Sequence, residues 1–250
     1  MREENVSFVN RRGQALSGVL HHPEAGTPRG GIILCHGMES NKESDKLMLL
    51  SQELAQRGLL ALRFDFACAG AEGKFEEITY SGEVEDLQAA FLFMRDRHVE
   101  KIALLGSSMG GTVALLFAAH HRGVATVVTV AAPMHPERFA SRLLTPAQVQ
   151  EWRKTGYISY HGQRINVSLL DDLEKINVPE AAQKISCPIF ILHGDRDEVV
   201  PVAEAHELHE YLKGSKRLSI LKGADHRLSD PASMNRAVTE AIAWLCEHVG

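Results

Sequence analysis

Short runs of consecutive hydrophobic residues alternate with amphipathic stretches along most of the chain. The hydrophobic runs are GIILCHG (31–37), LLALRFDF (59–66), KIALLG (101–106), VATVVTVAA (124–132), IFILHG (189–194) and RLSIL (217–221). The amphipathic stretches between them are 45–58, 82–98, 109–121 and 202–212. Continuous hydrophobic runs of this length are typical of strands buried on both faces of a parallel sheet. Because strands and helices alternate, the pattern predicts an α/β fold whose mostly parallel sheet is covered by helices on both faces.

The two ends of the chain complete this pattern. Residues 4–10 and 15–22 have short strand patterns separated by a turn, which predicts a hairpin at the N-terminal end. Three acidic residues between 83 and 86 are expected in the first turn of a helix, where the helix dipole favours negative charge. Hydrophobic residues spaced at helical intervals between 238 and 245 predict a final helix, with Ser233 as its N-cap.

One long stretch, from 134 to 185, contains no strand–helix unit. Its pattern predicts a helix, a small hairpin that turns at His161 and Gly162, and one or two short helices. Insertions of this length often form a cap over a functional face, although a peripheral decoration is the alternative. We therefore expect a core built from residues 1–133 and 186–250, with 134–185 inserted as a cap or lid.

A glycine-flanked serine marks the boundary between a predicted strand and a predicted helix. Gly106, Ser107, Ser108, Met109 and Gly110 form a G-x-S-x-G pattern. In this context the central serine occupies the tip of a strained turn, and the glycines allow strand and helix to approach closely. Ser108, which is centred between the glycines, is therefore the candidate nucleophile.

A serine nucleophile requires a general base and an acid that orients it. His226, in the loop after the last strand run, is the candidate base. The loop after 189–194 offers Asp195, Asp197 and Glu198. Asp197 is the candidate acid because its position further along the loop lets it reach His226, whereas Asp195 is expected to fix the loop.

Two backbone N–H groups are expected to stabilise the oxyanion of the reaction. One belongs to Met109, which follows the nucleophile, and the other to Met38, in the loop after the first central strand. Of the remaining histidines, His36 and His193 end strands and are expected to be structural. His120, His121, His206 and His209 lie on predicted helices and are expected to face solvent.

Composition and charge narrow the class of protein. The chain has 250 residues, 44% hydrophobic and 24% charged, with a formal net charge of −5, which is ordinary globular composition. No basic stripe is present to neutralise phosphates, which argues against nucleic-acid binding. No hydrophobic stretch approaches the ~20 residues of a membrane span, and the first residues lack the apolar region of a signal peptide. We expect a soluble cytoplasmic protein without membrane contacts, as a monomer or a homodimer.

The four cysteines give no indication of metal or redox chemistry. They stand at positions 35, 68, 187 and 246 and form no C-x-x-C pair. Cys35 and Cys187 lie in or beside hydrophobic runs and are expected to be small buried hydrophobes. Cys68 lies in a loop without an assigned base and is expected to be inert. No metal or organic cofactor is expected.

Five blocks of sequence resemble serine hydrolases of the α/β-hydrolase superfamily. In chain order they are CHGMESNK, RFDFACAGAEGKF, GSSMGG, HGDRDEVVP and GADH. More narrowly, GKFEEIT, HGDRDEVVP and the mid-chain insertion are similar to small bacterial carboxylesterases of the feruloyl (cinnamoyl) esterase type. The resemblance implies an eight-stranded sheet with its second strand antiparallel and a catalytic triad of Ser108, Asp197 and His226. The chain departs from its relatives at 65–70, where they often have a DxRGHG-like stretch.

We therefore expect a serine carboxylesterase that acts through an acyl-enzyme on a small-molecule ester, with aryl or hydroxycinnamoyl esters as one candidate class. Trp152, Tyr157 and Tyr160 in the insertion are candidate substrate-binding residues, and packing of the insertion onto the core is their alternative role. Two other functions stay open. One is another acyl hydrolase, such as a thioesterase, peptidase or perhydrolase, and the other is a ligand-binding protein with an inactive triad.

Overall fold

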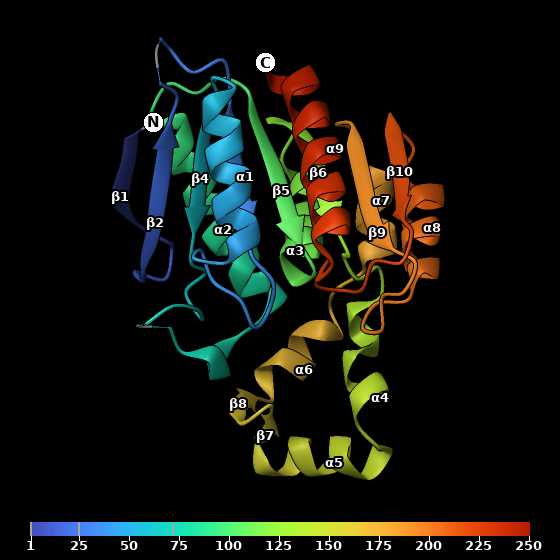
Figure 1. Cartoon of the computed structure of the whole chain (residues 1–250). Coiled ribbons are helices and arrows are strands. Elements are labelled where there is room, and N and C mark those ends of the chain that lie inside the picture. The colour runs from blue at the N-terminus through green and yellow to red at the C-terminus, as the bar shows by residue number, and fades with distance from the viewer. Residues whose placement is uncertain (1, 25, 72) are drawn as a thin grey trace.

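The computed structural model describes residues 2–24, 26–71 and 73–250. Its centre is an eight-stranded sheet with the order β1-β2-β4-β3-β5-β6-β9-β10 (Figure 1). The strands are β1 Arg2–Val9, β2 Ala15–His22, β3 Gly31–Cys35, β4 Leu60–Phe64, β5 Ile102–Ser107, β6 Val124–Val130, β9 Ile189–Gly194 and β10 Lys216–Leu221. The α/β-hydrolase fold predicted from the sequence is confirmed.

The direction in which successive strands are added to the sheet reverses near its centre. β2 pairs antiparallel with both β1 and β4, whereas the strands from β4 to β10 are mutually parallel. The chain runs from β3 outward to β4 and then returns across β3 to β5. The switch point of the sheet therefore lies at the carboxyl ends of β3 and β5, where open α/β sheets bind their ligands.

Helices cover both faces of the sheet. Those of the core are α1 Asp45–Gln56, α2 Tyr80–Arg95, α3 Met109–His120, α7 Val178–Lys184, α8 Val202–Tyr211 and α9 Pro231–Val249. α1 and α9 lie together on one face (Figure 1), and buried residues of α2, α3, α7 and α8 belong to the hydrophobic cluster of the other face. Within the ranges that the structure describes, none of the helices could cross a membrane.

Two details of the helix ends differ from the sequence prediction. α9 begins at Pro231 and its N-cap is Asp230, whose carboxylate accepts a hydrogen bond from the Ser233 backbone at 2.9 Å. A proline at the first helical position favours this earlier start. α2 begins at Tyr80, so only Glu83 lies in its first turn, and Glu85 and Asp86 lie beyond it. Asp86 is buried instead, and it accepts hydrogen bonds from the N-terminal hairpin turn.

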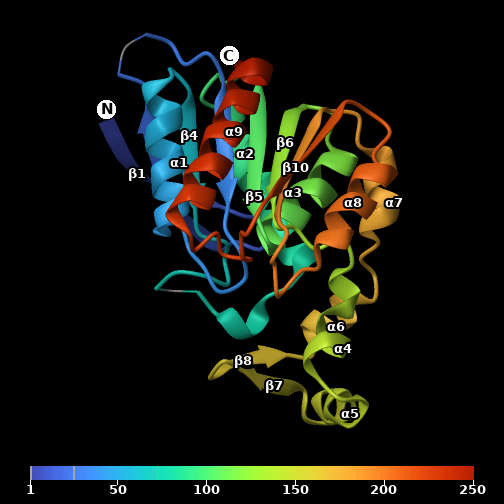
Figure 2. The same ribbon diagram turned by 45° about the vertical axis from the view of Figure 1, so that its right-hand side comes forward.

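The long segment between β6 and β9 adds no strand to the main sheet in the described structure. It contains η2 Pro136–Arg138, α4 Phe139–Leu143, α5 Pro146–Thr155, β7 Tyr157–Tyr160, β8 Gln163–Asn166 and α6 Ser168–Leu173. We refer to residues 136–173 as the cap. It projects from the edge of the sheet at which β5 ends (Figures 1 and 2).

The cap follows the predicted order of elements with one difference. The hairpin β7–β8 turns at His161 and Gly162, as expected. The single helix predicted first is interrupted, because Leu144 is extended and Thr145 starts α5 with a capping box. α7, the last element before β9, packs against α3 and α8 and so covers the sheet of the core. A short 3-10 helix, η1 Phe75–Glu77, meets β8 from the core side.

Candidate active site

Ser108 occupies a strained turn at the carboxyl end of β5. Its backbone has φ 52° and ψ −125°, in the left-handed range of φ that non-glycine residues rarely adopt. A Cβ on Gly106 would lie 2.2 Å from the Gly110 carbonyl oxygen, and a Cβ on Gly110 would lie 2.3 Å from the His36 oxygen. Both glycines are therefore required for the close approach of strand, helix and neighbouring loop, as the sequence pattern predicted.

The loop after β10 brings a histidine to the serine. His226 Nε2 lies 3.0 Å from Ser108 Oγ, and His226 Nδ1 lies 2.8 Å from Asp197 Oδ2. In the productive tautomer Nδ1–H donates to the carboxylate, which leaves Nε2 free to accept the serine proton. The three side chains that the sequence analysis singled out as nucleophile, base and acid thus form one continuous chain of hydrogen bonds.

Four donors hold the carboxylate of Asp197. Oδ1 accepts the backbone N–H groups of Val199 at 2.9 Å and Val200 at 2.7 Å, and Oδ2 faces His226 and, at 3.1 Å, His193. Burial alone would raise the pKa of Asp197, but the hydrogen bonds from His193, His226 and Val200 outweigh it and bring the pKa below its ordinary value. The acid is therefore ionised at neutral pH and fixed toward His226.

His193 has a role that the sequence analysis did not identify. It ends β9 and is buried, as expected of a structural residue, and its Nε2 also lies 2.9 Å from the Val200 carbonyl oxygen. This contact holds the ring in place, and the contact to Asp197 adds a second histidine at the carboxylate oxygen that faces His226. A histidine four residues before the acid was the available sequence signal.

The two other acids considered in this loop serve as ties between loops. Asp195 accepts a hydrogen bond from the Gly223 backbone at 2.6 Å, and Glu198 accepts one from the His226 backbone at 3.3 Å. Asp195 therefore fixes the loop, as expected, and Asp197 is the carboxylate that contacts the His226 ring.

The loop after β3 lies directly against the serine. A Cβ on Gly37 would be 3.3 Å from Ser108 Cβ and 3.9 Å from Ser108 Oγ, so only a glycine leaves this space open. Met38 follows immediately. Met109 is the first residue of α3, where the N–H groups have no partner within the helix. Both N–H groups selected from the sequence thus belong to backbone that borders Ser108.

His36, just before this loop, is buried and structural, as predicted. Its Nδ1 lies 2.8 Å from the Gly37 carbonyl oxygen and its Nε2 lies 3.1 Å from the Phe66 backbone nitrogen. Burial lowers the pKa of His36. The neutral ring donates at one nitrogen and accepts at the other, which joins the loop after β3 to the loop after β4.

The contacts of the loop after β4 show how it is held. Lys42 donates to Asp65 from both its backbone, at 2.7 Å, and its ammonium group, at 2.6 Å. Cys68 points away to a cavity of about 190 Å³, where its thiol donates to Glu83 at 3.4 Å. Burial raises the pKa of Cys68, so the thiol is not ionised at neutral pH. Cys68 is thus an inert group outside the triad, as expected.

A half-buried lysine contacts the neighbour of the candidate nucleophile. Lys46 Nζ, from the first turn of α1, donates to Ser107 Oγ at 3.1 Å. Burial lowers the pKa of Lys46 to about 8, and the negative charge of Asp225 offsets part of that shift. At pH 7 the ammonium group is charged in both the folded and the unfolded chain. The folded protein therefore carries the whole free-energy cost of burying this charge.

We expect Lys46→Met to raise the free energy of unfolding at pH 7 by about 1 kcal/mol or more, because an uncharged side chain replaces a desolvated charge. The folded protein loses this proton above pH 8, whereas the unfolded chain keeps it until about pH 10.5. The stability difference should therefore shrink as pH rises through that interval. Urea denaturation of both proteins between pH 7 and 10.5 measures it, and a difference that grows with pH would contradict the burial argument.

The three aromatic residues proposed for the cap have different surroundings. Trp152 is 1% exposed and packs in the hydrophobic cluster between cap and core. Tyr157 is 45% exposed, with the Arg164 guanidinium 4.1 Å from the centre of its ring. Tyr160 is half-buried against the core cluster, with its ring 5.6 Å from that of Phe139. Because side chains alternate along a strand, Tyr160 faces the core and Tyr157 faces away.

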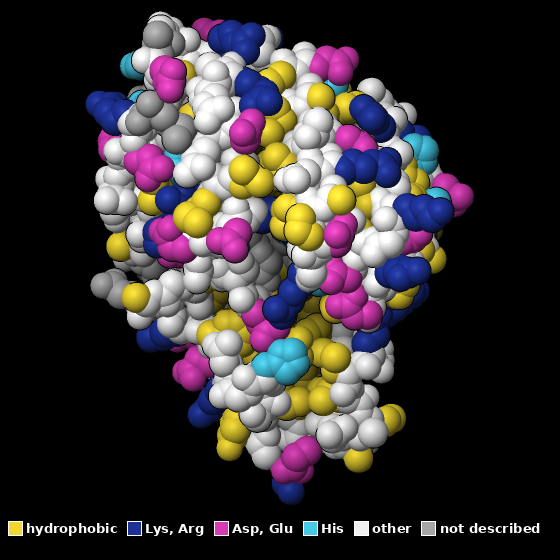
Figure 3. Space-filling view, viewed as in Figure 1, with side chains coloured by type: hydrophobic (Ala, Val, Ile, Leu, Met, Phe, Trp, Pro, Cys, Tyr) yellow, Lys and Arg dark blue, Asp and Glu magenta, His cyan; other side chains and the backbone are white. Residues whose placement is uncertain are grey.

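A recess separates the cap from the core, and hydrophobic side chains line it (Figure 3). The partly buried hydrophobic residues that pack against the core cluster include Met38 of the loop after β3, Phe75 of η1, and Phe139, Ile158 and Tyr160 of the cap. Apolar surface beside a nucleophile suits an apolar acyl group. Among the residues that the structure describes, no group of three or more His, Cys, Asp or Glu side chains could hold a metal ion.

The sheet order, the serine turn at the switch point and the hydrogen-bonded Ser–His–Asp chain define an α/β hydrolase. The sequence itself supports a narrower assignment. The chain belongs to the family described as serine aminopeptidase, S33, whose sequence profile matches residues 26–156 and 159–230. The match leaves out residues 1–25, 157–158 and 231–250.

Individual relatives are distant in sequence but similar over their length. The mitochondrial palmitoyl-protein thioesterase ABHD10 of Mus musculus is 26% identical over 250 residues, covering 94% of this chain and 80% of that protein. The esterase domain of a Rhodothermus marinus protein is 27% identical, with a TM-score of 0.79 and full coverage of both chains. Est1E from Butyrivibrio proteoclasticus, with ferulic acid bound, is 20% identical and shares the fold with a TM-score of 0.88 over 98% of this chain and 99% of that chain.

Proposed function

We propose that this protein is a serine carboxylesterase that hydrolyses carboxylic esters through an acyl-enzyme. The observation that carries the proposal is the continuous hydrogen-bond chain from Ser108 Oγ through His226 to Asp197, with distances of 3.0 and 2.8 Å. Nucleophile and base lie within the range needed for proton transfer. The ionised acid holds the ring in the tautomer that accepts the serine proton.

In the first half of the reaction Ser108 Oγ attacks the ester carbonyl carbon while His226 Nε2 takes the hydroxyl proton. The negative charge that develops on the carbonyl oxygen is stabilised by the N–H groups of Met38 and Met109, and removal of one such donor costs ~2.7–4 kcal/mol in the barrier. The tetrahedral intermediate collapses, and the imidazolium of His226 gives its proton to the leaving alkoxide. An alcohol departs, and the acyl group remains on Ser108.

In the second half a water molecule takes the place of the alcohol. His226 removes a proton from the water as its oxygen attacks the acyl carbon, and the same two N–H groups stabilise the second oxyanion. His226 then returns the proton to Ser108 Oγ as the acid leaves. This sequence consumes one ester and one water and yields one alcohol and one carboxylic acid, and the enzyme is restored.

Two of these relatives support the ester or thioester bond as the point of cleavage. The Rhodothermus marinus relative is described as an esterase domain, and the mouse relative is described as a palmitoyl-protein thioesterase. Both would use the same acyl-transfer chemistry, and the shape of the acyl pocket decides between substrates. The hydrophobic recess beneath the cap supports an aryl or other bulky apolar acyl group (Figure 3).

The second candidate function is thioester hydrolysis, which the mouse relative's description favours. A matched pair of substrates distinguishes the two, namely a phenyl ester and a phenyl thioester of the same acid. Carboxylesterase activity predicts turnover of the oxygen ester at least as fast as that of the thioester. A strong preference for the thioester would assign the enzyme to the second class.

The experiment that tests the proposal itself is labelling with a fluorophosphonate, because only an activated serine reacts rapidly with this reagent. We expect one label per chain on Ser108, and loss of labelling in His226→Ala. The loss of turnover of a panel of p-nitrophenyl and hydroxycinnamoyl esters should be proportional to the fraction of chains that carry the label. A chain that binds these esters but takes up no label would instead be a ligand-binding protein with an inactive triad.

We expect Tyr160→Ala to lower kcat/KM for bulky aryl esters by at least ~10-fold, which corresponds to ~1.4 kcal/mol. Burial of an aryl group against the ring stabilises binding by ~25 cal/mol per Å², and an acetyl group is too short to gain from it. The measurement is kcat/KM for p-nitrophenyl cinnamate and p-nitrophenyl acetate. Tyr157→Ala is the matched control, because Tyr157 faces away from the core. Equal losses of Tyr160→Ala on both esters would mean that the tyrosine supports the fold instead.

A further inference from the structure

The tip of the cap hairpin contacts the loop that carries Met38. His161 Nδ1, at the turn between β7 and β8, lies 2.8 Å from Glu39 Oε1. The two residues are 122 positions apart in the sequence, and Glu39 directly follows Met38. One end of this contact therefore belongs to the cap, and the other belongs to the loop that borders Ser108.

The hairpin turn fixes the position of His161 relative to Tyr160. His161 has φ 46° and Gly162 has φ 80°, the pair of positive φ values of a tight two-residue hairpin. The His161 ring stacks on the Tyr160 ring with their centres 4.2 Å apart. Burial raises the pKa of Tyr160, and the negative charge of Glu39 adds to this effect. A contact that holds His161 consequently holds Tyr160 as well.

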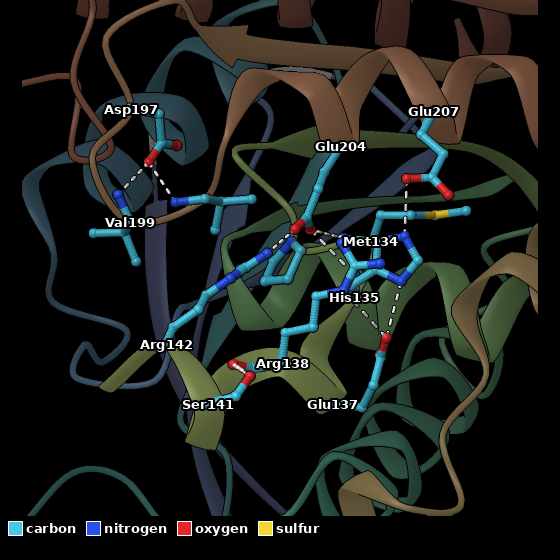
Figure 4. Close-up of polar contacts among 12 residues, drawn as sticks. Met134, His135, Glu137, Arg138, Ser141, Arg142, Asp197, Val199, Glu204 and Glu207 are labelled. Atoms are coloured by element: carbon cyan, nitrogen blue, oxygen red, sulfur yellow. Dashed lines mark hydrogen bonds and ion pairs between the residues drawn. The ribbon is translucent and has the colours of Figure 1, made fainter. Parts of the chain in front are cut away.

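The base of the cap is fastened differently from its tip. At the base, Arg142 of α4 pairs with Glu204 of α8, and Glu204 also accepts the backbone N–H groups of Met134 and His135 (Figure 4). Glu204 is 3% exposed. At the tip, by contrast, the side chains of His161 and Glu39 are 64% and 25% exposed. The contact at the tip can therefore break in water while the base stays attached, because exposed polar contacts between side chains contribute little stability.

We propose that Glu39 and His161 are a positioning pair that holds the cap hairpin, and with it Tyr160, over the acyl-binding recess and thereby sets the preference for bulky acyl groups. The pair opens to admit substrate and closes over the bound acyl group. Neither side chain touches the reacting atoms, so the pair acts on binding rather than on the chemical steps. This inference rests on the proposed esterase function.

Kinetics of four variants test the pair. Glu39→Ala and His161→Ala each remove the contact, and Glu39→Gln keeps a hydrogen-bonding partner. Arg153→Gln, the control, removes the exposed ion pairs of Arg153 with Asp171 and Glu174. We expect Glu39→Ala and His161→Ala to raise KM for p-nitrophenyl cinnamate about fivefold, as suits an exposed ion pair. Their kcat values and all constants for p-nitrophenyl acetate should change less than twofold. The KM of Glu39→Gln for the cinnamate should be close to that of the wild type, and the KM of Arg153→Gln should equal it.

The double variant Glu39→Ala/His161→Ala shows whether the two residues act together. We expect its KM for the cinnamate to equal that of the Glu39→Ala variant, because residues that act through one contact are not additive. Additive increases would show two independent effects and overturn the proposal. Equal losses of kcat on both esters would also overturn it, because the contact would then position the oxyanion donor of Met38.

Hydrogen exchange separates failure of this inference from failure of the proposed function. Backbone amides of residues 157–166 should exchange about fivefold faster in Glu39→Ala than in the wild type. In Arg153→Gln they should exchange at the wild-type rate. Both results are expected whether or not the protein hydrolyses esters. Unchanged exchange in Glu39→Ala would refute the pair. Faster exchange in a protein that hydrolyses no ester would refute the esterase function and leave the contact established.

Discussion

Ser108→Ala is expected to lower kcat for ester hydrolysis by ~10⁴-fold or more, because the nucleophile that forms the acyl-enzyme is absent. The fold should persist, since the hydroxyl contacts only the His226 ring among the hydrogen bonds of this site. The measurement is the rate of p-nitrophenyl ester hydrolysis at saturating substrate, with circular dichroism to verify the fold. Normal turnover by this variant would refute the proposed mechanism.

Two further substitutions make this test specific. Ser107→Ala should keep most activity, because Ser107 Oγ contacts Lys46 rather than the His226 ring. Ser108→Gly should be as inactive as Ser108→Ala yet more stable by ~1 kcal/mol, because glycine adopts a φ of 52° without the strain of a side chain. Urea denaturation of the two inactive proteins measures the difference. Lower stability of the glycine variant would contradict the assignment of strain to this turn.

Asp197→Asn is expected to lower kcat by up to ~10⁴-fold. The asparagine amide would donate a hydrogen bond to His226 Nδ1, which favours the tautomer with the proton on Nε2, and that tautomer cannot accept the proton of Ser108. The imidazolium that forms during attack would also lose the neighbouring negative charge. Steady-state kinetics on a p-nitrophenyl ester, with fluorophosphonate labelling of the same samples, measures both effects.

The matched control is Asp195→Asn, which removes a carboxylate from the same loop. Asp195 holds the Gly223 backbone at 2.6 Å and has no contact with the His226 ring among the described hydrogen bonds. We expect this variant to lose stability and to keep kcat within about tenfold of the wild type, since a loop tie acts on chemistry only indirectly. If Asp195→Asn proved more damaging to kcat than Asp197→Asn, the assignment of the acid would be wrong.

Much of the core was predictable because its signals are local. A strand buried on both faces needs a continuous hydrophobic run, so every central strand was visible as one. The serine turn was equally visible, since glycine is the only residue type that leaves room for the opposing backbone at positions 106 and 110. Helix starts were less well predicted. Asp230 and Ser233 are both good N-cap residues, and Asp230 is the N-cap of α9 because Pro231, directly after it, is the first helical residue.

The functions of individual cap residues were harder to assign, because the sequence shows residue types and not the surface that each side chain meets. Trp152, Tyr157 and Tyr160 are all large aromatic residues, yet one is enclosed, one faces solvent and one faces the core. The alternation of the hairpin separates Tyr157 from Tyr160 in principle. Which of the two faces meets the core depends on how the hairpin packs against η1, and that packing is set by residues far away in the sequence.

By itself the sequence determined the α/β-hydrolase fold and the chain order of the candidate nucleophile, acid and base, because hydrophobic periodicity and glycine requirements act over a few residues. Only the tertiary structure decided which groups assist them. His193 stands only four residues before Asp197, but the course of the turn after β9 decides that the two side chains meet. Glu39 meets His161 across 122 positions. Contacts between residues so far apart depend on the packing of whole elements, which no local pattern encodes.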